Sequence, residues 1–513
     1  MAEPGRAPLL AMSGICKSFG AVCANQAVDL VVRAGDVVGL LGENGAGKTT
    51  LMNILFGAYA ADDGEIQVDG RPVTIDSPAD ALALGIGMVH QHFHLVPSHT
   101  VLENLMVGQK GRAGRLDVAA ARARLGEIAE RYGLALDGDA LVGDLAIGEQ
   151  QRLEIVKALY HGARILILDE PTAVLTPQEA DGLFQALKSM VAAGGEGAGG
   201  MGIIFISHKL REVRALTNRI VVMRRGRVVA TLDDVAGVSD RQLAELMCGR
   251  EVTPPVRPQA TAGEPLLSLR QINTGGGRRS RLKDLSLEVL GGRILGIAGV
   301  SGNGQGELAN VIAGTLKPVS GQIRVGGKPV PRPSPRALQR LGVGRIPEDR
   351  IGTGLLISLP LTDSMVLPLV HRRPFSRFGL LNRRAIKDFV ETQIERFAIQ
   401  ADGAEARTGT LSGGNLQKAL LARELSIDPL VLLAAQPTRG LDVAAAGFVH
   451  EQFLDLRARG RAIVLISEDL EELFLLSDEI AVIYEGRITD PIPIEQATVR
   501  QIGLLMTGAG GTA

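Results

Sequence analysis

The chain has 513 residues, too many for one ordinary hydrophobic core, so at least two domains are expected. Its hydrophobic fraction of 45% and net charge of −1 indicate a globular protein and exclude a general attraction to nucleic acid. Three scattered cysteines exclude a disulfide framework or a cysteine metal cluster and favour a reducing cytosol. The sequence has neither an apolar leader nor a run of 18 apolar residues, so we expect it to stay in the cytoplasm and to reach a membrane only through a partner.

Residues 41–50 read Leu-Gly-Glu-Asn-Gly-Ala-Gly-Lys-Thr-Thr and match the spacing of a phosphate-binding loop at Gly42, Gly47, Lys48 and Thr49. A β-prone apolar stretch precedes this loop and a helical stretch follows it. The glycines let backbone N–H groups surround a polyphosphate, and the positive end of the helix faces the same anion. Lys48 would reach the β- and γ-phosphates, and the Thr49 hydroxyl would hold Mg²⁺. The sequence therefore predicts a nucleotide site.

Polar residues follow three further apolar stretches of the first half. The predicted strand 164–168 ends in Asp169 and Glu170, a pair that is costly to bury unless an ion or ligand compensates it. Asp169 would hold Mg²⁺ and Glu170 would orient or polarise the attacking water, although such a pair can also cap the next helix. Gln91 could reach the metal or the water, and His208 could contact the γ-phosphate.

Three segments of the first half recur in the same order in the second half, which predicts duplicated domains. We place the first domain at residues 8–250 and the second at residues 265–507. The proline-rich stretch 251–264 between them is expected to be an extended linker. The paired segments are 39–48 with 296–305, 85–91 with 342–348, and 145–150 with 411–416.

Within each half, short apolar strands alternate with helical stretches, which is typical of an α/β domain with a mainly parallel sheet. The clearest strands are 164–168, 202–206 and 219–223. Residues 100–160 have a helical period without strands, so we predict a helical subdomain inserted there. Residues 361–425 repeat this arrangement with a longer, arginine-rich insertion.

Together these motifs resemble the ATP-binding-cassette (ABC) ATPases over both halves. The resemblance implies two tandem P-loop NTPase domains that meet head to tail, with ATP between the phosphate loop of one and a Leu-Ser-Gly-Gly-Gln signature of the other. It implies that Phe19 stacks on adenine, that Lys48, Gln91, Glu170 and His208 are catalytic, and that Thr49, Gln91 and Asp169 hold Mg²⁺. The implied ATP-binding set is Phe19, Gly42, Glu43, Asn44, Gly45, Ala46, Gly47, Lys48, Thr49 and Thr50 from the first half, with Ser412, Gly413, Gly414 and Asn415 from the second.

The two halves are not equivalent at these positions. The first-half signature has Ala146 where serine is expected, whereas the second-half signature, residues 411–415, keeps its serine and both glycines and departs only at Asn415. Head-to-tail pairing would therefore collect all the defects in one composite site, and we predict one hydrolysed ATP per chain. In the second half, Gln305 replaces the lysine and Gly306 replaces the residue with the Mg²⁺-binding hydroxyl. Ala435 and Gln436 replace the two carboxylates, Glu348 replaces the glutamine and Glu468 replaces the histidine.

Three classes of ATPase fit a duplicated cassette: the motor of a membrane importer, a soluble protein acting on ribosomes, and a DNA-repair or chromosome ATPase. The ribosomal branch has two sound sites and a long charged linker, and repair ATPases carry zinc-binding cysteines or coiled coils, so we expect the importer. The degenerate second loop and the runs 344–350 and 434–442 resemble the sugar and nucleoside uptake branch. Residues 89–97 resemble its nucleoside members more than its ribose or galactose members, which stay the alternative.

The importer reading implies particular partners and a particular location. We expect two integral-membrane permease subunits, as a heterodimer, an extracytoplasmic solute-binding protein and no nucleic acid. The chain would be peripheral on the cytoplasmic face of the membrane. His90, His92 and His94 do not form a metal set with a carboxylate or cysteine, and we expect them at a surface or coupling interface. The arginines between 372 and 384 are expected on a solvated helical face or against a permease.

Overall fold

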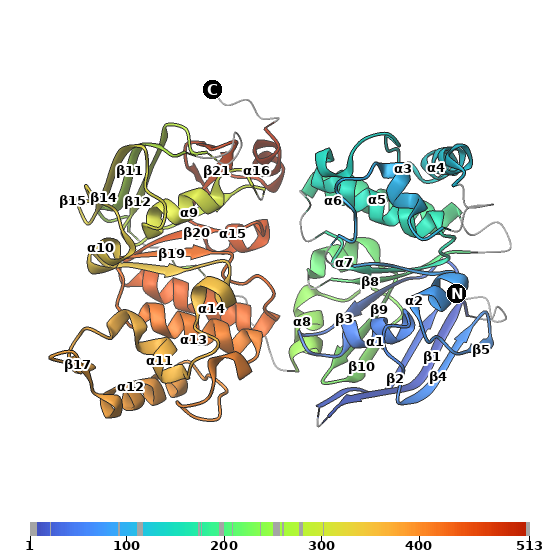
Figure 1. Cartoon of the computed structure of the whole chain (residues 1–513), viewed down its shortest axis with the longest axis horizontal. Coiled ribbons are helices and arrows are strands. Elements are labelled where there is room, and N and C mark those ends of the chain that lie inside the picture. The colour runs from blue at the N-terminus through green and yellow to red at the C-terminus, as the bar shows by residue number, and fades with distance from the viewer. Residues whose placement is uncertain are drawn as a thin grey trace. The chain divides into compact units, whose positions relative to one another are not determined.

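The computed structural model describes residues 8–508 except for 21, 91–92, 110–115, 173–174, 176, 194–199, 208, 236, 250–256, 259–260, 276–280 and 301. The chain divides into two compact units, Met1–Thr253 and Pro254–Ala513 (Figure 1). Most of the predicted linker 251–264 lies outside the described residues, so the predicted domain boundaries stay a prediction.

The main sheet of the first unit has six strands in the order β10-β9-β3-β8-β7-β6. All neighbours are parallel except β10 with β9. Every residue of β3 and β8 is buried, which is why these strands read as continuous apolar runs and not as alternating ones. The strands are β3 (Val37–Leu41), β6 (Ile86–Val89), β7 (Ile165–Asp169), β8 (Gly202–Ile206), β9 (Arg219–Arg224) and β10 (Arg227–Leu232).

An antiparallel sheet, which the sequence analysis did not predict, completes the core of the first unit. Its order is β2-β1-β4-β5, formed by β1 (Leu10–Phe19), β2 (Val22–Val32), β4 (Asp63–Val68) and β5 (Arg71–Val73). Alternate side chains of β1 and β2 join those of α1 (Lys48–Leu55) in one hydrophobic cluster. This cluster holds α1, and so the loop before it, between the two sheets.

The helical part of the first unit lies where the sequence predicts it (Figure 1). It contains α3 (Val101–Met106), α4 (Val118–Tyr132), a 3₁₀ turn at Val142–Asp144 and α5 (Ile147–Tyr160). Helix α3 begins with a reciprocal cap, in which Thr100 N donates to Glu103 Oε2 at 2.8 Å and Glu103 N donates to Thr100 Oγ1 at 3.2 Å. The remaining helices are α2 (Pro78–Ala83), α6 (Pro177–Ala193), α7 (Leu210–Leu216) and α8 (Asp240–Cys248).

The second unit repeats this plan, as the duplicated motifs predict. Its main sheet has seven strands, ordered β16-β19-β20-β13-β21-β22 with β23 also on β21, and its antiparallel sheet is ordered β12-β11-β14-β15. The strands are β11 (Pro265–Asn273), β12 (Leu285–Leu290), β13 (Ile294–Ala298), β14 (Ser320–Val325), β15 (Lys328–Pro329), β16 (Val343–Ile346), β19 (Val431–Ala435), β20 (Ala462–Ile466), β21 (Glu479–Tyr484), β22 (Arg487–Ile488) and β23 (Ile492–Pro493).

The helical subdomain of the second unit differs from the prediction at one place. The arginine-rich insertion between α11 (Leu361–Val366) and α12 (Arg383–Arg396) contains a small antiparallel hairpin where only helix was expected. The hairpin is formed by β17 (Ser376–Arg377) and β18 (Leu380–Leu381). Pro374 and Gly379 account for it, because both residues disfavour a helix interior. The helices of the unit are α9 (Gln305–Ala313), α10 (Pro335–Arg340), α11 (Leu361–Val366), α12 (Arg383–Arg396), α13 (Gly413–Leu425), α14 (Val443–Ala458), α15 (Leu470–Leu476) and α16 (Val499–Met506).

A buried ion pair ties α14 to the main sheet of the second unit. Arg457 donates from Nη2 to Asp478 Oδ1 at 2.6 Å and from Nε to Asp478 Oδ2 at 2.8 Å. Ile294 N and Arg293 Nη1 donate to the same carboxylate. Burial alone would raise the pKa of Asp478, but these hydrogen bonds and the charge of Arg457 outweigh it and hold the pKa below its ordinary value.

Within the described part of the chain, every helix is too short or too polar to cross a lipid bilayer.

Candidate functional site

The phosphate loop connects β3 to α1, and its backbone requires glycine at two positions. Gly42 has a φ of 152° and Gly47 a φ of 99°. A Cβ atom on Gly42 would stand 2.3 Å from the carbonyl oxygen of Met223, and one on Gly47 would stand 2.2 Å from that of Ala24. Both glycines are therefore needed for close approach as well as for conformation. Asn44, Gly45 and Thr49 are exposed on the open side of the loop, while Ala46 and Gly47 are buried under it.

Lys48, the first residue of α1, lies over the phosphate loop. Its Nζ donates to the carbonyl oxygens of Gly42 at 2.6 Å and Glu43 at 3.0 Å. Burial lowers the pKa of Lys48, whereas the charges of Glu170, Asp169 and Glu43 oppose that change. The lysine predicted to bind phosphate and the two carboxylates predicted to act with it therefore lie close together.

Asp169 and Glu170 lie at the carboxyl end of β7. Burial, followed by the charge of Glu170, raises the pKa of Asp169 to about 6, and Lys48 opposes this. Glu170 has a left-handed backbone, with a φ of 48°, and its N–H donates to Ile206 O at 2.9 Å. A non-glycine residue in that conformation is strained and is commonly found at functional sites. A partly buried carboxylate whose charge is electrostatically disfavoured fits a divalent cation, because the cation would offset the cost of that charge.

Glu212 links the two loops that flank this carboxylate pair, and the sequence analysis missed it. Its carboxylate accepts hydrogen bonds from Thr172 Oγ1 at 2.6 Å and Ser207 Oγ at 2.9 Å. In the second unit Glu472 accepts from Thr438 Oγ1 at 2.7 Å in the same way. A fuller comparison of the two halves would have found this signal, because a Thr and a Glu recur at matching positions after the two strands.

Two predicted site residues lie outside the described residues. Gln91 follows β6 and His208 follows β8, and their roles stay predictions. The two residues next to His208 in the sequence are described, and they are hydrogen-bonded to each other. Lys209 N donates to Ser207 Oγ at 3.1 Å.

Phe19, predicted to stack on adenine, ends β1 with 46% of its surface exposed. Tyr59 contacts its ring edge-on, with centroids 5.4 Å apart, and the Lys17 ammonium lies 5.7 Å from the Phe19 centroid. Two aromatic residues, Phe19 and Tyr59, therefore lie together at the position predicted for adenine stacking. Tyr59 was not predicted from the sequence. Tyr59 is far from Phe19 in the sequence, and no local pattern indicates that the two residues are in contact.

The two signature helices begin with opposite chemistry. Helix α13 begins after Ser412, whose Oγ accepts from Asn415 Nδ2 at 2.9 Å, and the space beside Gly413 is open. Asn415 Oδ1 in turn accepts from Gln400 N at 2.9 Å. The departure from the signature pattern at Asn415 therefore leaves the serine hydroxyl and the start of the helix accessible, which suits an anion.

Helix α5 of the first unit begins with Ala146 and two carboxylates instead. Ala146 has no hydroxyl, and its N–H donates to Glu149 Oε2 at 2.9 Å. A Cβ atom on Gly148 would stand 2.5 Å from Glu179 Oε1, so this second carboxylate also lies at the start of the helix. Negative charge here stabilises the helix itself but repels a phosphate.

The second unit keeps the backbone of the nucleotide site without its chemistry. The buried Gln305 begins α9, and its amide packs against Gly299 much as Lys48 lies over Gly42. Its Oε1 lacks a hydrogen-bond partner among the described residues. Gln436 has the same φ of 48° as Glu170, and its N–H donates to Ile466 O at 2.8 Å. The frame is conserved between the units, but the cation and both carboxylates are lost.

Arginines tie the second-unit signature helix to the main sheet. Arg350 donates from Nη1 to Gly413 O at 3.3 Å and from Nη2 to the carbonyl oxygen of Arg439. Arg439 in turn pairs with Glu348, the residue that corresponds to Gln91 in the repeated sequence.

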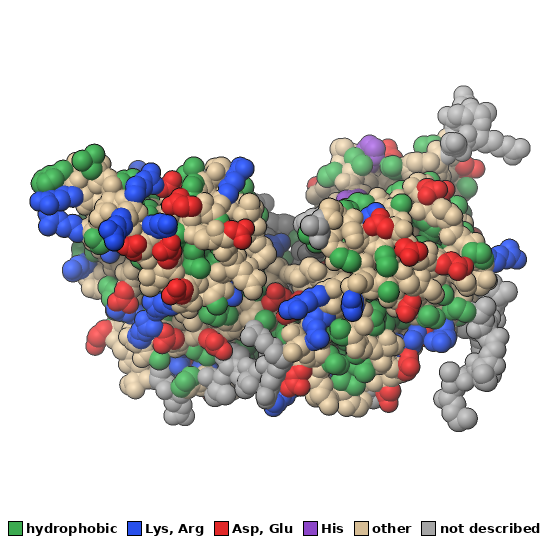
Figure 2. Space-filling view, turned by 90° about the horizontal axis from the view of Figure 1, so that it is seen from below, with side chains coloured by type: hydrophobic (Ala, Val, Ile, Leu, Met, Phe, Trp, Pro, Cys, Tyr) green, Lys and Arg blue, Asp and Glu red, His purple; other side chains and the backbone are tan. Residues whose placement is uncertain are grey.

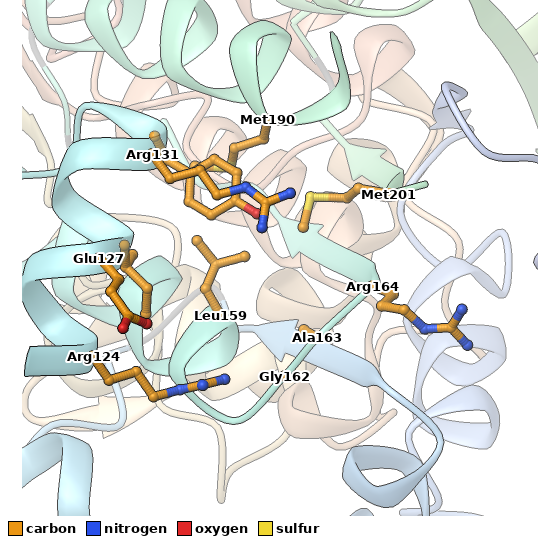
Figure 3. Close-up of a pocket in the computed structure, with 11 residues that line it drawn as sticks. Arg124, Glu127, Arg131, Leu159, Gly162, Ala163, Arg164, Met190 and Met201 are labelled. Atoms are coloured by element: carbon orange, nitrogen blue, oxygen red, sulfur yellow. The ribbon is translucent and has the colours of Figure 1, made fainter. Parts of the chain in front are cut away.

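The pocket drawn in Figure 3 is separate from the nucleotide residues. It has a volume of about 250 Å³ and lies among α4, α5, α6 and the start of β7. Arg164 points away from it to Asp69, at 2.5 Å, and Arg124 Nε donates to Tyr160 O at 2.9 Å. These arginines already have partners in the fold. Groups of three or more histidine, cysteine or acidic residues that could hold a metal ion are absent from the described ranges.

The sequence matches the family model described as ABC transporter at residues 25–173 and again at 282–439. It is 41% identical over 505 residues to the nucleoside import ATP-binding protein NupA of Lactococcus lactis, covering 98% of both chains. It is also 43% identical over 538 residues to the glucose import ATP-binding protein TsgD13 of Haloferax volcanii, covering 98% of this chain and 96% of that one.

Among solved structures, the chain is similar to one described as a complex of the archaeal ribosomal stalk protein aP1 and the archaeal ribosome recycling factor aABCE1. The TM-score is 0.62 at 19% identity, and the match covers 97% of this chain and 92% of that chain. At this identity the likeness supports the fold alone. With both phosphate-loop frames in place and the family model matched twice, the chain belongs to the ABC transporter family of ATPases and carries two of its cassettes.

Proposed function

We propose that the chain is the ATP-hydrolysing subunit of a membrane importer for nucleosides. The observation that carries the proposal is the asymmetry of the two cassettes. The first groups a lysine and two carboxylates at one nucleotide site, whereas the second keeps that backbone with neutral side chains. NupA, one of the full-length relatives, is a nucleoside import ATP-binding protein by name.

In the proposed hydrolytic site, each first-unit residue has a distinct task. Residues 42–50 would surround the phosphates, and Lys48 would exchange the carbonyl oxygens of Gly42 and Glu43 for the β- and γ-phosphates. Asp169 and the Thr49 hydroxyl would hold Mg²⁺, which neutralises charge on the phosphate oxygens when bound. Glu170, fixed by its N–H bond to Ile206, would orient and polarise the attacking water.

We propose that this site is completed by the second-unit signature. Ser412, Gly413 and Gly414 would contact the γ-phosphate, since the start of α13 offers a hydroxyl and accessible backbone. The start of α5 lies beside two carboxylates, Glu149 of α5 itself and Glu179 of α6, and suits that task poorly. Gln91 and His208 are proposed to act at the same hydrolytic site, which would turn over one ATP per chain.

A cleft in the first unit supports the proposed docking of a permease. It has a volume of about 240 Å³ and lies between the core, at Phe56 and β6, and the helical subdomain, at α3 and α5. His90 and His94 line it with ring centroids 4.5 Å apart, beside Glu154 and Lys157. A cytoplasmic helix of a permease that bound in this cleft would contact both the core and the helical subdomain, so a movement of one against the other would displace it.

The proposal includes a complete transporter. Two permease subunits, as a heterodimer, would form the pathway and an extracytoplasmic binding protein would deliver the solute. The chain would lie peripherally on the cytoplasmic face of the membrane. We propose no nucleic-acid partner.

The experiment that tests the solute is uptake of labelled nucleosides in cells that carry this chain and its permeases. Lys48→Ala is the loss-of-function control, and Gln305→Ala, at the same position of the second cassette, is the matched control. Unlabelled ribose and galactose are the competitors. Uptake that requires Lys48, tolerates the change at Gln305 and ignores free sugars is the expected result.

The second candidate is the same role in a monosaccharide importer of the ribose or galactose type. The 43% identity to a protein named for glucose import favours it. Lys48-dependent uptake that free sugars abolish would establish this candidate. A soluble role on ribosomes would be the remaining alternative if uptake of every solute were independent of Lys48.

The number of bound nucleotides tests the degenerate site. Glu170→Gln should trap ATP, and the bound ATP per chain can then be counted in purified protein. A count of one is expected if Gln305, Ala435 and Gln436 leave the second site empty. A count of two would mean that the degenerate site binds ATP without hydrolysing it.

A further inference from the structure

The hairpin β17–β18 of the second unit is a fixed projection. Its strands pair Ser376 with Leu381 and Arg377 with Leu380. At its base, Phe375 is buried in a small hydrophobic cluster and packs edge-on against Phe389, with centroids 5.1 Å apart. Asn382 N donates to Phe375 O at 2.8 Å and closes the base. The tip is therefore presented by a packed framework.

The tip of this hairpin is apolar and strongly exposed. Phe378 is 89% exposed and Leu380 is 77% exposed, which makes them the most exposed large hydrophobic side chains described in the chain. Phe378 also adopts a left-handed backbone, with a φ of 53°, in the two-residue turn that it forms with Gly379. Asparagine or glycine is favoured at such a position, and an aromatic residue there is strained. Neither hydrophobic burial nor turn geometry explains a phenylalanine at this site.

The apolar tip is flanked in the sequence by positively charged residues. Residues 371–384 contain five arginines and no acidic residue. Arg383 pairs with Asp363 at 2.5 Å, whereas the other four have no carboxylate partner among the described residues. The Arg377 guanidinium lies 5.2 Å from the Phe378 ring centroid. In Figure 1 the hairpin projects beyond α11 and α12, and the side chains at that edge of the unit in Figure 2 are hydrophobic and basic.

We propose that this hairpin, together with the flanking residues of the segment 371–384, binds the surface of an anionic lipid bilayer. Phe378 and Leu380 would enter the boundary between headgroups and acyl chains, and the arginines behind them would contact lipid phosphates. An apolar tip with basic residues behind it matches a bilayer interface, in which the acyl chains lie inside the layer of anionic headgroups. Phe378 is the only aromatic side chain at the tip, and Leu380 beside it offers no ring on which a second nucleobase could stack, which favours lipid over nucleic acid.

The inference rests on the proposed function in one respect, which is that an importer subunit lies beside a membrane. Lipid binding can be measured on the purified chain without permeases, nucleotide or transport. Failure of the nucleoside assay and failure of the lipid assay are therefore separate outcomes. The hairpin contributes none of the residues assigned to ATP, so basal ATPase activity is expected to be unchanged in its variants.

The test uses the absence of tryptophan from the sequence. Phe378→Trp places a single fluorophore at the tip, and Val319→Trp places one at a residue that is 76% exposed in the same unit. Each full-length variant is mixed with vesicles of phosphatidylcholine alone or with phosphatidylglycerol. We expect a blue shift only for Phe378→Trp, only with phosphatidylglycerol, and lost at high salt.

Two further variants separate the apolar and charged contributions. Replacing Arg372, Arg373 and Arg377 together by glutamine should lower the vesicle partition coefficient on the order of 100-fold. Phe378→Ser with Leu380→Ser should abolish sedimentation with vesicles. The proposal is overturned if Phe378→Trp shows no shift with anionic vesicles or if Val319→Trp shifts equally. It is also overturned if the Phe378→Trp shift requires permease in the vesicles, which would identify a protein partner.

Discussion

Glu170→Gln should abolish ATP hydrolysis while leaving the fold and ATP binding intact. The carboxylate would be replaced by an amide of the same shape, which cannot take a proton from the attacking water. Loss of a general base costs about 10²- to 10⁴-fold in rate. That corresponds to about 3 to 5 kcal/mol of lost transition-state stabilisation.

The structure supplies a natural example of this substitution. Gln436 occupies the equivalent position of the second unit, with the same φ of 48° and an equivalent N–H bond of 2.8 Å to Ile466. The strained backbone therefore accepts glutamine, and the free energy of unfolding should change by about 0.5 kcal/mol or less. Removing one charge beside Asp169 also relieves the repulsion that helps to raise the pKa of that carboxyl.

The assay is steady-state phosphate release by the purified chain, with fluorescent ATP binding measured on the same samples. Gln436→Glu is the matched control and should not restore a second hydrolytic site, because Ala435 and Gln305 still lack a metal ligand and a cation. Hydrolysis within about threefold of the unmodified rate in Glu170→Gln would refute the assignment of the base. A large loss of ATP binding would instead make Glu170 a binding residue.

Three further predictions concern the ion pair, the metal and the signature helix. Asp478→Asn should cost about 3 to 5 kcal/mol in urea unfolding, because it leaves Arg457 buried without its counter-charge. The pKa of Asp478 is lowered, so its contribution is present above the unfolded-state pKa and should disappear as the pH falls through the folded-state pKa. The Mg²⁺ concentration needed for half-maximal hydrolysis should rise as the pH falls below about 6, because Asp169 then holds a proton that the cation must displace. Arg350→Ala should speed hydrogen exchange at the start of α13 and raise KM for ATP, since it removes the link to Gly413 O; unchanged exchange would contradict that role.

Much of the fold and the position of the site followed from local sequence patterns. Buried strands such as β8 are continuous apolar runs, and the phosphate loop requires glycine for steric reasons that the spacing reveals. The predicted membership of the ABC ATPases is confirmed by the family match. The residues that the second half lacks at its nucleotide-site positions could also be identified from the sequence, because each replacement changes the type of side chain.

What the sequence did not reveal depends on contacts between distant residues. The pairing of β1 with β4 and the contact of Phe19 with Tyr59 join segments whose closeness has no local signal. The hairpin at Phe378 was missed because two-residue strands are too short to produce a period. The roles of Gln91 and His208 and the domain boundaries stay predictions.

The carboxylates at the start of α5 have a consequence for assembly. If two copies of the first unit paired in the head-to-tail way proposed above for unlike units, Glu149 and Glu179 of each would face the γ-phosphate held by the other. Repulsion would disfavour that symmetric pair, whereas the hydroxyl and accessible backbone at the start of α13 would favour a pair of unlike units. Under the proposed pairing, these two acidic side chains would disfavour contact between two first units and so reduce ATP hydrolysis by wrongly paired cassettes.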